Sequence, residues 1–414
     1  MLSAVALLTL ANAAQPFPYM EELRQKERAV NEAVQPSPKR PFAMQMLAFT
    51  QSDVGESMLS AETYNSAYPR TQWTPEESTA NAERARKILG EYQSREAVAA
   101  IVSAARDRQI VILNEAHHVS RHRAFATLLA IELRKLGFEY LAVETLDDRT
   151  PEPVAGLQQR RYPLVGDGYY SKEPLFGDFL RRSLAAGYRP VAYEFSAYVG
   201  DVTKLSPVER QIQREAGQAQ NIIDHVLVRN PRARILVYVG YGHAHKGLSD
   251  VGGQKIGLMA EQLRVKSGID PLCIDQAFNS WPKLVERDKP VVDAVLKKFS
   301  GDAFVMAKRD GAGYWNDGSV DIHVWHRPVT LRQGREHWLA MGGYRKPKAI
   351  PSELLPREGR RLVQAFVAGE SADAVPVDQV LVTAGETPPV FMLPKGKYRF
   401  AWQDYPQSFS GFFG

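Results

Sequence analysis

The sequence has a single cysteine, no long apolar segment and no block of positive charge. Cys273 alone cannot build a disulfide framework, and because it lies deep in the chain it is no lipidation site next to an N-terminal signal. No apolar run is long enough to cross a bilayer. The net charge of +5 is spread along 414 residues, without the clusters of Lys and Arg interleaved with aromatics that bind nucleic acids. We therefore expect no nucleic-acid partner and no integral membrane segment.

Three common enzyme signatures are also absent. The chain has no Gly-x-Ser-x-Gly elbow, no His-Glu-x-x-His helix and no Gly-rich phosphate loop with Lys-Ser or Lys-Thr. Cys273 lies within an apolar strand, which is a core position rather than that of an exposed thiolate. These observations argue against a serine enzyme of the α/β-hydrolase type and against a P-loop enzyme.

The N-terminus has the pattern of an export signal. Leu2 to Leu10 form a short apolar run, and Ala11-Asn12-Ala13 follow as a small-x-small cleavage site. We predict a signal peptide over 1–14 and a periplasmic or secreted protein. Residues 15–73 contain several prolines and little periodicity, which predicts a partly ordered leader with short helices.

From Thr74 onward, helical segments alternate with short apolar strands. Thr74 with Glu77, and Ser206 with Glu209, have the spacing of capping boxes that start helices. Another helix is expected over 95–106. The predicted strands are 110–113, 140–143, 191–193, 235–239, 272–274 and 304–306. This alternation predicts an α/β fold with a mostly parallel β-sheet flanked by helices.

The C-terminal part has a different pattern. The alternation of helices and strands stops after Pro328, and residues 397–402 alternate aromatic with polar or small side chains. Residues 377–382 are expected to pair with them. Two strands are not stable alone in water, so this small β appendage, within 351–414, should pack on the main domain or recruit further strands.

Polar residues follow four of the predicted strands directly. Glu115 and His117 follow the first strand, Glu144 and Glu194 follow the next two, and His243 follows the fourth, between Gly240 and Gly242. In a parallel sheet these ends share one edge, where ligands bind. The set suits a divalent transition metal such as Mn, Zn, Co or Fe, and it suits equally a metal-free site with a histidine base.

Several of these residues also have simpler interpretations. Glu194 is more often a helix cap or a salt-bridge partner than a catalyst. Arg214 is either an oxyanion or substrate partner on a helix beside the sheet, or a member of a surface salt bridge. His225 is expected to be a packing residue within a helix, and His323 and His326 have packing roles as readily as site roles.

The segments NEAHHVSRH and GYGHAHKG, together with AVET and REAGQAQNI, resemble motifs of the erythromycin esterase-like, ChaN-like and Tiki proteins. The resemblance covers about residues 109–345, and we assign 74–350 to such an α/β domain. It implies that Glu115, His117, Glu144 and His243 form the core site and hold any metal, while His122 and His245 match more variable positions. Asn114 departs from the pattern, because it replaces the usual glycine.

The resemblance implies more than one function. Members include metal-dependent proteases, esterases with a histidine base and haem-binding proteins of iron uptake. We expect an exported hydrolase acting on an ester or amide carbonyl of a small-molecule or peptide substrate. The alternative is a haem or iron-binding protein, with His118, His122, Tyr241 and His245 as candidate cofactor residues. A third alternative is a protein whose catalytic edge has lapsed and which acts by interaction.

Overall fold

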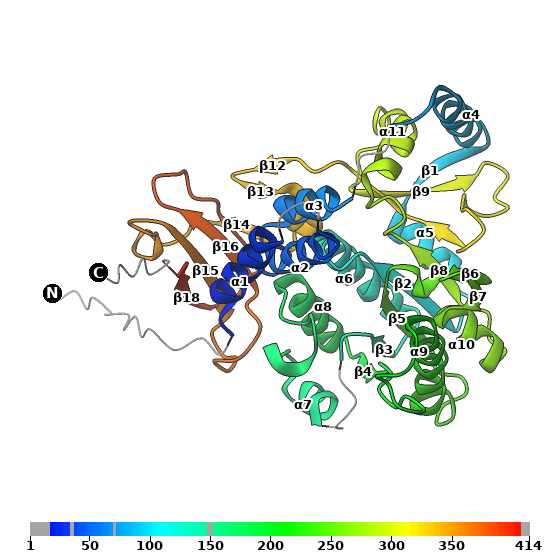
Figure 1. Cartoon of the computed structure of the whole chain (residues 1–414), viewed down its shortest axis with the longest axis horizontal. Coiled ribbons are helices and arrows are strands. Elements are labelled where there is room, and N and C mark those ends of the chain that lie inside the picture. The colour runs from blue at the N-terminus through cyan, green and yellow to red at the C-terminus, as the bar shows by residue number, and fades with distance from the viewer. Residues whose placement is uncertain (1–16, 34–36, 69–71, 147–151, 407–414) are drawn as a thin grey trace.

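A six-stranded parallel sheet forms the centre of the molecule (Figure 1). The structure is a computed structural model and describes residues 17–33, 37–68, 72–146 and 152–406. The strand order is β10-β8-β2-β5-β3-β4, and every neighbouring pair is parallel. The strands are β2 (Ile110–Glu115), β3 (Tyr140–Val143), β4 (Arg189–Ala192), β5 (Ile235–Gly240), β8 (Leu272–Asp275) and β10 (Ile322–His323). The predicted α/β class is confirmed.

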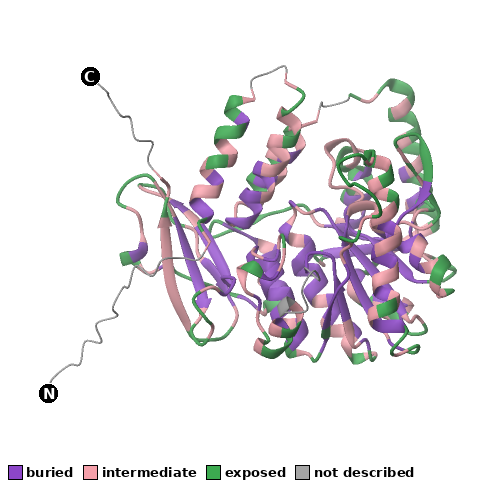
Figure 2. Cartoon of the chain, turned by 60° about the horizontal axis from the view of Figure 1, so that its bottom comes forward, coloured by how far each residue is buried: buried purple, intermediate pink, exposed green. Residues whose placement is uncertain are grey.

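Side chains of the central strands alternate between two apolar cores. Figure 2 shows these strands as buried. Val111 and Leu113 of β2 face one core, and Ile110 and Ile112 face the other. The first core is covered by α5 (Ala97–Ala104), α6 (Ser120–Lys135), α7 (Glu152–Arg160) and α8 (Pro174–Ala185). The second is covered by α9 (Pro207–Ile222), the π-helical segment η2 (Ile223–Leu227) and α10 (Met259–Ser267). The strand ends are therefore left free to carry the polar residues.

Both capping boxes are present, at the start of α4 (Pro75–Glu91) and of α9. A predicted helix and a predicted strand are present, but the helix starts later than expected and the strand lies outside the parallel sheet. The helix predicted over 95–106 begins only at Ala97, because residues before it belong to β1 (Tyr92–Glu96). The strand predicted at 304–306 is β9 (Ala303–Lys308), which pairs antiparallel with β1 and β11 (Trp325–His326) outside the parallel sheet. Helix α11 (Pro282–Leu296) packs on α4 beside this second sheet.

The C-terminal strands form an antiparallel sheet around β15 (Arg360–Val367). β16 (Asp378–Thr383) and β18 (Tyr398–Asp404) flank it on either side, so the predicted direct pairing of 377–382 with 397–402 is wrong. The tail recruits β15 between the two. Short pairs complete the strands: β14 (Lys346–Lys348) with β17 (Phe391–Leu393), β12 (Leu331–Arg332) with β13 (Arg335–Glu336), and β6 (Leu248–Val251) with β7 (Gln254–Gly257). Short 3-10 turns are η1 (Val165–Asp167), η3 (Tyr241–Ala244), η4 (His337–Gly343) and η5 (Ser352–Leu354).

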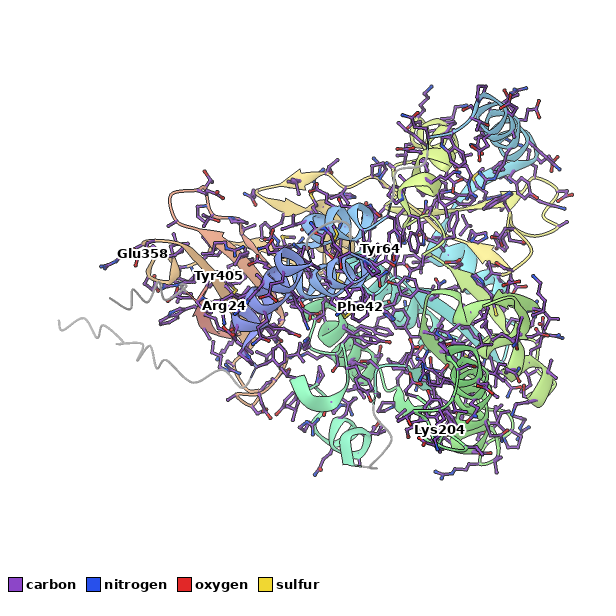
Figure 3. The ribbon with its side chains drawn as sticks, viewed as in Figure 1. Arg24, Phe42, Tyr64, Lys204, Glu358 and Tyr405 are labelled. Atoms are coloured by element: carbon purple, nitrogen blue, oxygen red, sulfur yellow. The ribbon has the colours of Figure 1, made fainter. Side chains whose placement is uncertain are left out.

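Three helices precede α4 in the described part of the chain: α1 (Tyr19–Glu32), α2 (Arg40–Asp53) and α3 (Ser57–Ser66). Helix α1 packs on the C-terminal sheet, where Arg360 pairs with Glu27. Figure 3 labels Arg24 of α1 and Tyr405, which follows β18, in this region. Helices α2 and α3 pack together, and Phe49 and Tyr64 carry aromatic rings to the end of β2. The predicted signal peptide lies outside the described residues.

None of the helices in the described ranges combines the length and the apolar character that a membrane-spanning segment requires.

Candidate functional site

Glu115 is the last residue of β2, and both of its carboxylate oxygens have hydrogen-bond partners. Its Oε1 lies 2.8 Å from Nδ1 of His117. Arg123 of α6 donates to both carboxylate oxygens, at 2.9 and 3.0 Å, and the Tyr238 hydroxyl donates to Oε2 at 2.7 Å. Burial would raise the pKa of Glu115, but Arg123 and His117 hold it below its ordinary value. An ionised carboxylate accepts hydrogen bonds and cannot donate them, so Nδ1 of His117 carries the proton. Nε2 is left as the basic atom of the ring.

Glu144 follows β3 and lies between the two histidines. Its Oε1 accepts from Nη2 of Arg214 at 2.6 Å and lies 3.8 Å from Nε2 of His243. Its Oε2 accepts from the Gly240 amide at 2.7 Å and from the Tyr170 hydroxyl at 2.9 Å. Burial would raise the pKa of Glu144, but His243 and Arg214 lower it to about 2. The carboxylate is therefore ionised over the physiological pH range.

His243, in η3 after β5, forms a second carboxylate–imidazole pair. Its Nδ1 lies 2.8 Å from the carboxylate of Glu215, which is fully buried on α9. Nη1 of Arg214 points at Nε2 of His243 from 3.0 Å, so this nitrogen accepts. Burial lowers the pKa of His243, but Glu215 and Glu144 outweigh burial and raise it. The two carboxylates thus favour the protonated form of the imidazole, and the Arg214 guanidinium disfavours it.

The two pairs lie on either side of Glu144, at a position that is partly exposed. The side chains of His117, His243 and Arg214 are 19%, 15% and 25% exposed, whereas the carboxylates behind them are almost completely buried. Aromatic rings line this position on the His117 side. Tyr170 lies 4.5 Å and Tyr241 4.9 Å from the ring of His117 between centroids. Partly exposed imidazoles and a guanidinium backed by buried carboxylates are the kind of groups found at catalytic sites.

Tyr241 has an unusual backbone conformation at this site. Its φ is +42°, a region that residues other than glycine rarely adopt. Nδ2 of Asn114 donates to the Tyr241 carbonyl at 2.7 Å and to Asp275 at the same distance. Asn114 therefore connects three strand ends and holds the loop that carries His243.

The sequence analysis placed Glu115, His117, Glu144, His243 and Arg214 correctly at one edge, and the structure brings all five together. Glu194 also joins them, because Nε of Arg214 donates to it at 2.9 Å. Four residues with direct contacts to the site were not predicted: Arg123, Tyr170, Glu215 and Tyr238. The sequence could have indicated two of them. Arg123 lies one turn into the helix that follows the first strand, and Glu215 is the neighbour of Arg214 in the sequence.

The predicted metal ligands are already engaged by protein groups. Both oxygens of Glu115 face Arg123, Oε1 of Glu144 and Nε2 of His243 face Arg214, and Oε2 of Glu144 accepts two further hydrogen bonds. A divalent cation would share these atoms with a guanidinium. No three His, Cys, Asp or Glu side chains among the described residues are arranged as a metal site. The donor set therefore fits an arginine-bridged site rather than a metal centre.

The four candidate cofactor residues lie in different surroundings. His118 is buried and stacks on Tyr64 at 3.7 Å, and with His122 it lines a cavity of about 290 Å³. Nδ1 of His122 accepts from the Ala116 amide at 3.0 Å. Tyr241 and His245 do not line that cavity. Tyr241 packs on His117 instead, and Nε2 of His245 lies 3.5 Å from Asp275.

The remaining histidines pack as the simpler interpretation expects. Nδ1 of His225 contacts the Ala192 carbonyl, the His323 ring lies 4.3 Å from the Phe278 ring at a tilt, and His326 is buried against Gln276.

Gly240 is required for the close approach of the two pairs. A Cβ on this residue would lie 2.6 Å from Cε1 and Nε2 of His117 and 3.1 Å from Oε2 of Glu144. Because Glu115 fixes the His117 ring, we expect Gly240→Ala to lower the free energy of unfolding by about 1–3 kcal/mol and to shift the His117 imidazole resonances. Gly242→Ala is the matched control, since its Cβ would meet Leu258 at an ordinary 3.5 Å. Equal stability of both variants would contradict the packing described.

Comparisons with known proteins return distant likenesses. No model of a protein family matches this chain, and no curated protein does. Among solved structures, the type III effector HopBA1 is 14% identical with a TM-score of 0.34, over 56% of this chain and 94% of that chain. RRSP, a MARTX toxin effector domain from Vibrio vulnificus CMCP6, is 15% identical with a TM-score of 0.30, over 60% of this chain and 54% of that one. At these values the likenesses carry no argument about function.

Proposed function

We propose that this chain is an exported hydrolase that cleaves an ester or amide carbonyl without a metal, and that it belongs with the erythromycin esterase-like, ChaN-like and Tiki proteins. The observation that carries the proposal is the pair of carboxylate–imidazole contacts, Glu115–His117 and Glu215–His243, on either side of Glu144. Two oriented imidazoles beside an arginine supply a base and a positive charge in one partly buried site.

In this proposal His117 is the general base. Its Nδ1 proton is held by Glu115, so Nε2 takes a proton from water as the water oxygen adds to the carbonyl carbon. The carbonyl oxygen gains negative charge, which the Arg214 guanidinium stabilises, while His243 accepts a hydrogen bond from Arg214 and helps to orient it. His117 then returns its proton to the departing alkoxide or amine, the bond from that group to carbon breaks, and a carboxylic acid remains. Glu144 and Glu194 keep the Arg214 guanidinium in place.

The test is hydrolysis of ester and peptide libraries by the full chain, with and without prior treatment with a chelator. We expect turnover that survives chelation, because the residues above perform every step. Turnover that is lost on chelation and restored by Mn, Zn or Co would contradict the metal-free mechanism. An absorption spectrum of the isolated protein belongs to the same experiment, and a Soret band with no hydrolysis would favour haem binding instead.

A further inference from the structure

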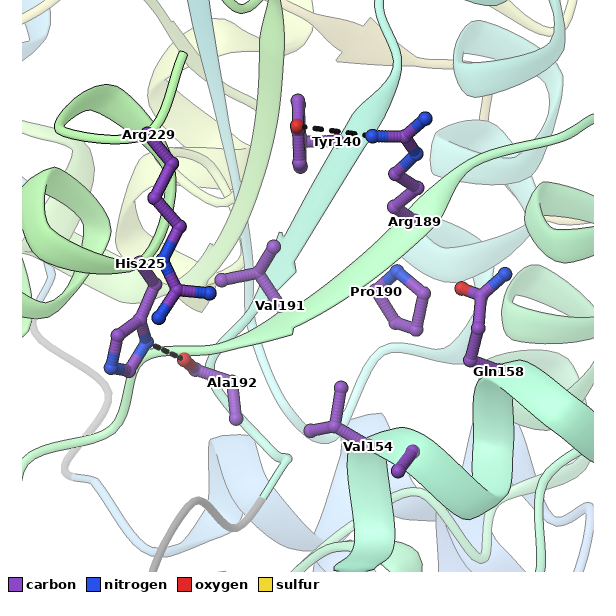
Figure 4. A pocket seen from close by; sticks show the side chains of 10 residues that line it. Tyr140, Val154, Gln158, Arg189, Pro190, Val191, Ala192, His225 and Arg229 are labelled. Carbon is purple, nitrogen blue, oxygen red and sulfur yellow. Dashed lines mark hydrogen bonds between the residues drawn. The ribbon is translucent and has the colours of Figure 1, made fainter. Parts of the chain in front are cut away.

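A groove of about 700 Å³ lies at the open edge of the six-stranded sheet, beside β4 (Figure 4). Strand β4 forms its floor, α7 one wall, and η2 with the turn after it the other. None of the residues assigned to hydrolysis lines this groove. It is a separate concave surface and needs an explanation of its own.

The groove does not have the features of an edge that accepts another strand. Pro190, in β4, has no amide proton to donate to a neighbouring strand. The carbonyl of Ala192 accepts a hydrogen bond from Nδ1 of His225 at 3.0 Å, as Figure 4 shows. His225 belongs to η2, and such π-helical turns are rare and concentrate at functional sites. The backbone edge is thus blocked and capped, which leaves the side-chain surface as the binding surface.

That side-chain surface is mainly apolar at its base. Pro190, Val191 and Ala192 are buried along β4, and Val154 and Ala155 face the groove from α7. A flexible apolar chain laid on them would be removed from water, at about 25 cal/mol for each Å² buried. The volume lies within the range of pockets that bind small molecules.

Two arginines give the groove a positive rim. Arg189 and Arg229 both line it and are exposed. Nη1 of Arg189 contacts the Tyr140 hydroxyl at 3.3 Å, and its guanidinium lies 5.6 Å from the centre of the Tyr140 ring. A guanidinium pairs best with a planar carboxylate, which it can bind through two parallel hydrogen bonds. The groove therefore complements a ligand with one apolar chain and one carboxylate.

We propose that this groove binds a monomeric long-chain carboxylate. The chain lies on the apolar floor formed by Pro190, Val191 and Ala192, and the carboxylate pairs with Arg229, while Arg189 adds positive potential at the rim. The inference is independent of the proposed hydrolysis, since it rests on a different edge of the sheet.

The test is calorimetric titration of the full chain with dodecanoate, kept below its micelle concentration, and with dodecan-1-ol as the neutral analogue. We expect saturable binding of dodecanoate and at least tenfold weaker binding of the alcohol. Arg229→Gln should weaken dodecanoate binding at least tenfold, and Ala155→Trp should abolish it by filling the groove. Arg86→Gln, on α4 away from β4, is the matched control and should bind as the wild type does (Figure 1).

Three results would overturn the proposal. The first is no saturable binding of dodecanoate to the wild type. The second is equal affinity for the acid and the alcohol, or dodecanoate binding that neither Arg229→Gln nor Ala155→Trp changes. The third is binding to phosphatidylglycerol vesicles in the absence of any binding to the monomeric acid, which would identify the surface as a membrane contact. Thermal unfolding of each variant confirms that a loss of binding is not a loss of fold.

Discussion

Arg123→Met is expected to lower the free energy of unfolding by about 3–5 kcal/mol, the range for removing one partner of a buried ion pair. Arg123 is almost completely buried between the carboxylates of Glu115 and Glu173, and it is the cation that both face. Methionine keeps much of the volume of the side chain but leaves two buried acids without their positive charge. The measurement is denaturant unfolding at pH 7, with Arg106→Met on the surface as control.

The pH dependence of this variant follows from the sign of the Glu115 shift. In the wild type the pKa of Glu115 in the folded protein lies below its value in the unfolded chain. The ionised carboxylate therefore stabilises the fold above about pH 4.3, and this stabilisation is lost as the pH falls through the folded pKa. Without Arg123, burial raises the folded pKa, and the carboxyl can become neutral on acidification. The stability deficit of Arg123→Met should therefore be largest at neutral pH and shrink below pH 5.

A second variant distinguishes lost charge from lost packing. Glu115→Gln combined with Arg123→Met should recover part of the deficit, because one of the two unpaired carboxylates is gone. If the double variant loses as much as the sum of both single variants, then the ion pair is not what stabilises this part of the core.

The sequence predicts strand ends better than it predicts the residues that complete the site. Glu115, Glu144 and His243 follow short buried runs directly, so the parallel sheet alone brings them to one edge. Tyr170 and Glu215 reach the same place from a long loop and from a helix face. Their positions depend on how α8 and α9 pack on the sheet, which local periodicity does not encode.

The wrong strand predictions have a similar physical origin. Residues 304–306 form an apolar run like that of a central strand. Their side chains are buried in the β1-β9-β11 sheet, so the apolar run does not tell which of the two sheets the strand joins. In the tail, alternation identified β18, but the partner of an antiparallel strand is chosen by side-chain contacts across the sheet. Val363 of β15 lies opposite both Val380 and Trp402, and this three-stranded order buries more apolar surface than a pair would.

His117→Asn is expected to reduce kcat on any ester or amide that the wild type hydrolyses by about a thousandfold, within the range for loss of a general base. Asparagine retains a group that can donate to Glu115, but its amide cannot accept a proton from water as Nε2 does. Because His117 acts on the attacking water, KM should change little. His337→Asn, in η4, is the control for loss of an imidazole elsewhere.

The His117 result also separates the proposed hydrolase from a protein whose site has lapsed. A lapsed site would not respond to the loss of this imidazole, whereas His117→Asn should remove nearly all of the hydrolysis rate if His117 is the base. Residual activity above a tenth of the wild type would assign the base to another residue, and His243→Asn would then be the variant to compare. Activity unchanged in both variants, with melting temperatures equal to that of the wild type, would show that the strand-end site does not perform the hydrolysis.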